Sequence, residues 1–95
     1  MSYEIVFRVD AEKEWRKLDP SIRQQFAKKL RERAEHPHNP AAKLHGLEDC
    51  YKIKLRQTGY RLVYEVDDGK IIIIVVAIGH RDKNQAYQKA KARQG

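Results

Sequence analysis

Two neighbouring runs in the middle of the chain, residues 50–56 and 60–66, alternate between apolar and polar side chains. Successive side chains of a β-strand point to opposite faces, so each run has one apolar face and one polar face. The link between them, Gln57-Thr58-Gly59, is short, polar and ends in glycine, which is typical of a hairpin turn. The pattern therefore predicts a β-hairpin that packs one face on a core. That face carries Tyr51, Ile53, Leu55, Tyr60, Leu62, Tyr64 and Val66.

The residues before the hairpin predict one strand and two helices. Apolar residues alternate weakly over 3–9, as in a strand, and Asp10 is suited to cap a short helix that ends near Leu18. Asp19 followed by Pro20 favours the start of a second helix. This helix should have about four turns, because its apolar stripe recurs at every fourth position. The stripe consists of Ile22, Phe26, Leu30 and Ala34.

The remaining segments predict a loop, one long strand and a last helix. Residues 36–49 break the helical period with two prolines, an Asn and a Gly, and we expect them to run over the surface as a loop. After a turn signal at Asp67-Asp68-Gly69, residues 70–79 are apolar on both faces, which indicates a strand at the centre of the sheet. We expect residues 82–93 to form a helix with Tyr87 as its one large apolar residue, and therefore to dock weakly.

This order of elements, β-α-α-β-β-β-α, predicts an α+β fold with a small, antiparallel-rich sheet packed against an N-terminal helical pair. The 95 residues are enough for one domain, 1–95. They contain neither a secretory signal nor an apolar run near the roughly 20 residues that span a bilayer, so we expect a cytoplasmic protein without a membrane partner.

Charge and cysteine content restrict the partners. With 20 Lys and Arg against 13 Asp and Glu, the net charge is +7, which favours nucleic acid or another polyanion. The single cysteine excludes an internal disulfide, and no spacing of Cys and His resembles a zinc site, so we predict no metal.

The polar face of the predicted hairpin is basic. It carries Lys52, Lys54, Arg56 and Arg61, with Glu65 as the opposite charge. Like charges side by side on a sheet are destabilising, so this cluster predicts a site for phosphate. The alternative is a solvated outer face, since edge strands often carry Lys against aggregation. Arg81, at the end of the central strand, is well placed to hold a further functional cation.

Four segments closely resemble the RelE family of bacterial toxins, and the similarity extends over essentially the whole chain. They are residues 14–18 (EWRKL), 43–46 (KLHG), 50–56 (CYKIKLR) and 59–64 (GYRLVY). The resemblance implies an endoribonuclease that needs no cofactor and cuts messenger RNA in the ribosomal A site. In this chemistry the 2′-hydroxyl attacks the adjacent phosphodiester. It also implies a RelB-like antitoxin, and contacts with operator DNA through the toxin–antitoxin complex.

The resemblance places the catalytic positions at Lys52, Lys54, Arg61, Arg81 and Tyr87. Physical chemistry favours the arginines as phosphate ligands, because a guanidinium stays charged and binds two oxygens at once. The lysines are candidates for proton transfer, since neighbouring cations lower a lysine pKa. Tyr87 either stacks on a base or touches the reacting hydroxyl, or it anchors the last helix.

Three further residues are predicted RNA contacts: Arg56, His45 and His80. The two histidines stand where the family has basic residues. His80 has two interpretations, a phosphate contact or acid–base group near neutral pH, and a tolerated loop residue.

Two other functions remain open from the sequence. ParE-type toxins resemble RelE but block DNA gyrase, an activity that does not require the five catalytic positions together. A basic RNA-binding protein without catalysis would lose affinity gradually with each substitution, with no decisive residue.

Overall fold

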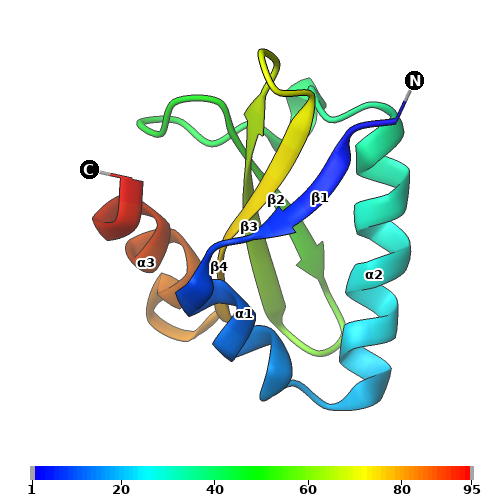
Figure 1. The fold of residues 1–95 in the computed structure, drawn as a ribbon. Helices are drawn as coiled ribbons and strands as arrows, with labels where there is room; N and C mark the ends of the chain where they lie inside the picture. Colours follow the sequence, from blue (N-terminus) through cyan, green and yellow to red (C-terminus); the bar gives the residue numbers. More distant parts are fainter. Residues whose placement is uncertain (1, 95) are drawn as a thin grey trace.

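The computed structural model describes residues 2–94, without the side chain of Lys83 (Figure 1). Its elements follow the predicted order, with two additional 3-10 turns. They are β1 (Glu4–Phe7), α1 (Val9–Arg16), α2 (Pro20–Glu35), η1 (Pro40–Ala42), β2 (Cys50–Leu55), β3 (Tyr60–Asp67), β4 (Ile72–His80), η2 (Asp82–Asn84) and α3 (Gln85–Gln94). The α+β class and the antiparallel-rich sheet are confirmed.

The described strands form one four-stranded sheet in the order β1-β4-β3-β2. β4 pairs with β3 antiparallel and with β1 parallel, so the predicted central position of the apolar strand is confirmed. β2 pairs with β3 antiparallel, and no further described strand pairs with its outer edge, where Tyr51 forms an isolated bridge with Lys43. No helix in residues 2–94 is both long and apolar enough to cross a membrane.

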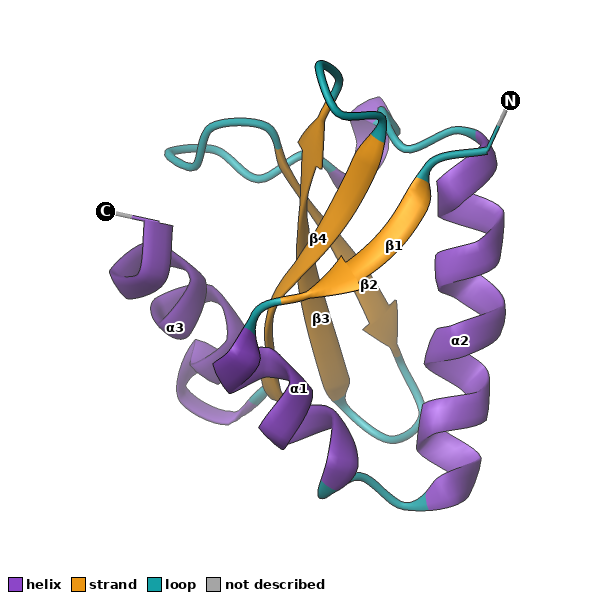
Figure 2. Ribbon diagram, in the orientation of Figure 1, coloured by secondary structure: helices purple, strands orange, loops and turns teal. Residues whose placement is uncertain are grey.

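Helices cover both faces of this sheet (Figure 2). On one face, the predicted stripe of α2 packs against the apolar face of the hairpin, with Phe26 and Tyr64 completely buried. On the other face, Ala86 and Ala90 of α3 lie against Val63 and Ala77. The hairpin therefore buries its apolar face as predicted, and its basic face borders α3.

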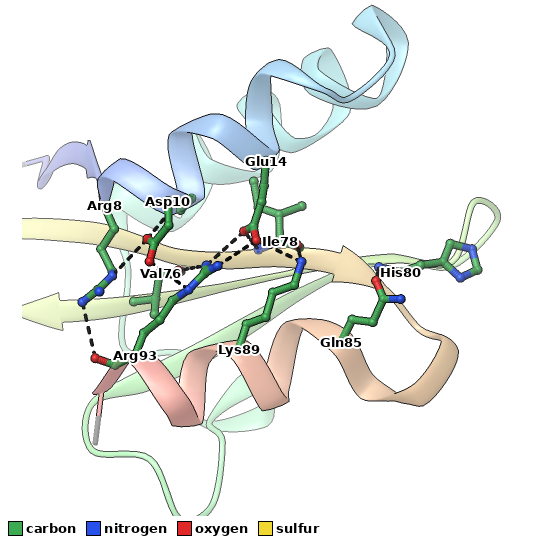
Figure 3. Close-up of polar contacts among 10 residues, drawn as sticks. Arg8, Asp10, Glu14, Val76, Ile78, His80, Gln85, Lys89 and Arg93 are labelled. Atoms are coloured by element: carbon green, nitrogen blue, oxygen red, sulfur yellow. Dashed lines mark hydrogen bonds and ion pairs between the residues drawn. The ribbon is translucent and has the colours of Figure 1, made fainter.

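Side chains complete the edge of β4 beyond the end of β1 (Figure 3). β1 pairs with β4 only as far as Val75, which leaves the following backbone groups without a strand partner on that side. Four side chains from α1 and α3 bond these groups. Arg93 donates to the carbonyl of Val76 (2.8 Å), Lys89 donates to that of Ile78 (3.1 Å), Glu14 accepts from the N–H of Ile78 (3.0 Å) and Gln85 accepts from that of His80 (3.3 Å).

The same side chains pair with one another. The Glu14 carboxylate lies 2.8 Å from Arg93 and 2.9 Å from Lys89, and Asp10 lies 3.0 Å from Arg93. Polar contacts thus attach a helix that has little apolar surface. We name the group of Glu14, Lys89 and Arg93 the edge clamp.

Two predicted strand boundaries are wrong. The first strand ends at Phe7 instead of Val9, because Arg8 is the N-cap of α1 and Val9 begins that helix with 77% of its surface exposed. The central strand begins at Ile72, because Ile71 lies in the preceding turn with φ +56° and is 41% exposed.

Candidate active site

The pairing of β2 with β3 brings the basic residues of the hairpin together. Lys54 lies directly opposite Arg61. Glu65 pairs instead with Cys50, towards the far end of the hairpin, where burial and then the charges of Asp49 and Asp67 raise its pKa. The cations around Lys54 and Arg61 are therefore not neutralised by the carboxylate of their own strand face.

A pocket of about 290 Å³ lies at the turn end of this hairpin. We name it the basic pocket; it is lined by Lys54, Leu55, Arg56, Gly59, Tyr60, Arg61 and Arg81. Three separate parts of the chain supply its four cations: β2 with the turn after it, β3, and the residue that follows β4. No Asp or Glu is among the described residues that line it. The pocket therefore suits an anion small enough to touch several cations at once.

The backbone holds Arg81 at the rim of the basic pocket. Its N–H donates to the carbonyl of Gly59 at 2.7 Å, which ties the end of β4 to the β2–β3 turn. Gly59 has φ +76°, and a Cβ at this position would lie 2.9 Å from the ring of His80. The close approach of the two segments thus requires glycine.

Two contacts fix the guanidinium of Arg61. It donates to the side-chain carbonyl of Asn84 at 3.2 Å and lies 5.2 Å from the ring centroid of Tyr87. Asn84 has φ +52°, a conformation that Asn tolerates better than most residues. Sequence reasoning missed Asn84; its signal was an Asn in the turn that follows Arg81.

Tyr87 lies beneath Arg61 and packs into the second core cluster. Its hydroxyl is buried and has no hydrogen-bond partner among the described residues, which carries a cost of about 1–3 kcal/mol. In this conformation the tyrosine anchors α3 and supports Arg61 from below. A contact between its hydroxyl and RNA would require the ring to move.

Neighbouring positive charges affect the pKa of Lys54, as the sequence predicted. The charge of Lys52 lowers the pKa of Lys54 most, followed by slight burial and by the charges of Arg61 and Arg56. Lys52 itself lies outside the basic pocket; it lines an adjoining groove that also includes Lys54 and Arg56. The two lysines therefore share this groove, and Lys54 also lines the basic pocket.

The predicted RNA contacts are separated by the fold. Arg56 lines the basic pocket, whereas His45 lies exposed in the loop before β2 and lines neither hollow. His80 faces a neighbouring hollow, where its ring meets Tyr60 edge-on at 5.3 Å and lies near the carbonyl of Thr58 (3.2 Å). This arrangement gives His80 a role in holding the turn.

The basic pocket can stabilise a phosphoryl group whose negative charge increases. Cations that are already in place lower the barrier for such a step without the cost of reorganisation. Its donors come from rigid strands and from a turn tied by a backbone hydrogen bond, which limits their movement.

The chain is similar in sequence to known toxins of bacterial toxin–antitoxin systems. Residues 5–85 match the family model described as ParE toxin of type II toxin–antitoxin system, parDE. An Escherichia coli protein described as a RelE-like toxin is 56% identical over 98% of both chains. The mRNA interferase toxin RelE of Escherichia coli K12 is 48% identical over 98% of both chains.

Solved structures of RelE have the same fold as this chain. An arginine-to-alanine double mutant of Escherichia coli RelE in the free state superposes with a TM-score of 0.91, at 47% identity over 98% of both chains. The toxin in the intact Escherichia coli RelBE toxin–antitoxin complex superposes with a TM-score of 0.81, at 51% identity over 83% of this chain and 96% of that one.

Proposed function

Because this chain belongs to the ParE toxin family of type II toxin–antitoxin systems, with RelE toxins among its full-length relatives, we propose that it is an endoribonuclease toxin. It cleaves messenger RNA in the A site of the ribosome and so stops translation. The observation that carries the proposal is the convergence of Lys54, Arg61 and Arg81 on one pocket in a chain 48% identical to an mRNA interferase.

In the proposed reaction the 2′-hydroxyl of a nucleotide attacks the phosphorus of its own 3′ phosphodiester. The bond to the 5′ oxygen of the next nucleotide breaks, and this oxygen receives a proton. Arg61 and Arg81 hold the phosphoryl oxygens as charge develops. Lys54, with its lowered pKa, exchanges protons with the reacting oxygens. Lys52 stabilises the RNA backbone beside the reacting phosphodiester. Tyr87 supports Arg61 from below and is the candidate for base stacking.

The ribosome supplies what the pocket lacks. The described residues that line the pocket include no histidine and no carboxylate for proton transfer, so substrate geometry has to contribute to the rate. We expect defined messengers on programmed ribosomes, in contact with 16S ribosomal RNA in the cytoplasm, to be cleaved at A-site codons. Naked RNA of the same sequence should remain largely intact. Inhibition of gyrase in a supercoiling assay, without messenger cleavage, would instead identify a ParE-type activity.

Asn84→Gly tests how Arg61 is positioned. Glycine tolerates the φ of +52° but removes the acceptor that lies 3.2 Å from the guanidinium. Loss of one hydrogen bond of about 0.5–1.5 kcal/mol predicts a roughly 2- to 10-fold lower kcat on programmed ribosomes. Asn84→Asp keeps an acceptor but adds a negative charge beside the phosphate site, so its kcat should fall further than that of Asn84→Gly. An unchanged kcat in Asn84→Gly would contradict a positioning role.

The proposed partner in the cell is an acidic RelB-like antitoxin, with which the toxin represses their operon through operator DNA. The related Escherichia coli toxin has been solved in such a complex. The antitoxin either covers the basic face or displaces α3, which little apolar surface holds in place. We expect displacement, seen as faster amide exchange over residues 85–93 in the complex while α2 stays protected. Unchanged exchange over 85–93 would exclude it.

A further inference from the structure

A second basic hollow runs along the outer edge of β2, and of its lining residues only Lys52 and Lys54 take part in the reaction proposed above. We name it the edge groove. It lies between α2, η1 and β2, has a volume of about 350 Å³ and shares Lys54 and Arg56 with the basic pocket. It is lined by Lys29, Arg33, Asn39, Ala41, Ala42, Lys52, Lys54 and Arg56. The two hollows therefore form one continuous basic surface around the end of the hairpin.

Arg33 is held in place at the wall of this groove. Its guanidinium donates to the carbonyl of Lys52 at 3.0 Å and to the hydroxyl of Tyr64 at 3.1 Å. Tyr64 is completely buried and in turn donates to the carbonyl of Pro37 at 2.8 Å. Because neutral oxygens accept these bonds, Arg33 keeps its full positive charge while losing much of its freedom to move. Such a preorganised cation loses less conformational entropy when it binds an anion.

The charge of the edge groove is not compensated locally. Five of its lining residues are cations, and none of the Asp or Glu side chains that the structure describes forms an ion pair with any of them. The cations on β2 repel one another, as the lowered pKa of Lys54 reflects. A bound anion would relieve this repulsion. A solvated face needs neither a concave shape nor an arginine fixed by two hydrogen bonds.

We propose that the edge groove binds backbone phosphate of the same RNA strand whose scissile phosphodiester occupies the basic pocket. This inference rests on the proposed function, because it takes the strand in the basic pocket as its starting point. The shared residues Lys54 and Arg56 favour one continuous strand over two separate ligands. The spacing of phosphates along RNA is regular, so a strand fixed at the basic pocket presents its neighbouring phosphates to the groove. Contacts to phosphate fix the position of the RNA strand on the protein, but they do not distinguish one base from another.

Binding of extended oligonucleotides tests the edge groove directly. A short RNA with a 2′-O-methyl group at the reacting nucleotide cannot be cleaved, and it is compared with versions extended by a few nucleotides at the 5′ or the 3′ end. Fluorescence anisotropy at low salt measures the affinity of the wild type and of Lys29→Ala and Lys28→Ala. Both lysines are exposed on α2 and the substitutions change the net charge equally, but of the two only Lys29 lines the groove.

We expect one of the two extensions to raise the affinity several-fold in the wild type. Lys29→Ala should abolish this gain and reduce the slope of log affinity against log salt by about one. Lys28→Ala should retain the gain. If neither extension raises the affinity, or if the two variants lose it equally, the groove is not a phosphate site of this strand. If the gain appears with a separate ribosomal RNA fragment and not with either extension, the single-strand arrangement is wrong.

The proposed function is tested separately. Programmed ribosomes that the wild-type protein leaves intact would overturn the nuclease proposal, whereas the oligonucleotide affinities would still report on the groove. On programmed ribosomes, Lys29→Ala should raise KM and leave kcat unchanged, because Lys29 lines the edge groove and not the basic pocket. A lower kcat with unchanged KM would contradict the assignment.

Discussion

Replacement of Arg81 by alanine is expected to lower the rate of ribosome-dependent messenger cleavage about 10²- to 10³-fold, the usual effect of removing one well-placed cation from a developing oxyanion. Growth arrest on expression should disappear with it. The fold should persist, because the side chain is exposed and the turn is held by backbone bonds. The N–H of Arg81 donates to Gly59, and its carbonyl accepts from Asn84 at 3.0 Å. Alanine keeps both bonds.

Arg31→Ala is the matched control for this prediction. Arg31 is exposed on α2 and lines neither the basic pocket nor the edge groove, so its loss changes net charge equally without removing a pocket cation. Cleavage should stay within about twofold of the wild type. Lys54→Ala should behave like Arg81→Ala. Undiminished cleavage by the Arg81 and Lys54 variants, or equal losses in the Arg31 variant, would show that the basic pocket is not the site of the reaction.

Alternation along the hairpin was sufficient to predict that its basic residues share one face, whereas the grouping of Arg81 with them came from the resemblance. A two-residue period places Lys54 and Arg61 on one face, and a three-residue link leaves few possible registers for them. The apolar run before Gly79 likewise identified the central strand and therefore the position of Arg81. These features depend on interactions between residues that are close in the sequence. The fold class follows from them once the two N-terminal helices are added.

Features that depend on packing between distant segments could not be predicted. The edge groove forms because α2 lies beside the outer edge of β2, and no local pattern gives that distance. Asn84 meets Arg61 because a turn after β4 folds back on β3. The two strand boundaries that were wrong, at Val9 and Ile71, involve apolar residues that are exposed in the structure. Alternation counts such residues as buried.

The polar attachment of α3 is a further feature that the sequence pattern could not predict. Apolar periodicity measures the surface that a helix can bury, and by that measure α3 is poor. Periodicity does not register a salt bridge or a side chain that bonds an open strand edge. The edge clamp supplies both, because Glu14, Lys89 and Arg93 bond the edge of β4 and one another. The sequence predicted weak docking of α3, whereas in the structure ion pairs and hydrogen bonds of charged side chains hold the helix in place.

Glu14→Gln is accordingly expected to lower the free energy of unfolding at pH 7 by about 1–3 kcal/mol. It should also speed amide exchange in α3. The carboxylate is 19% exposed and accepts hydrogen bonds from Arg93 and Ile78, so a neutral amide removes one of the two carboxylates that pair with Arg93 and leaves only Asp10. Glu12→Gln, on the exposed side of the same helix, removes only a surface pair with Arg16 and should cost less than about 0.5 kcal/mol.

A sharper test is the pH dependence of the difference in unfolding free energy between the wild type and Glu14→Gln. Burial raises the pKa of Glu14, but the hydrogen bonds from Arg93, Lys89 and the N–H of Ile78 outweigh it and hold the pKa below its ordinary value of 4.5. A depressed pKa stabilises the fold above pH 4.5, and this stabilisation is lost as the pH falls through the folded-state pKa. Urea titrations of the wild type and Glu14→Gln should therefore differ at pH 7 and converge in acid. A difference that persists undiminished at low pH would mean that the carboxylate charge is not what attaches α3.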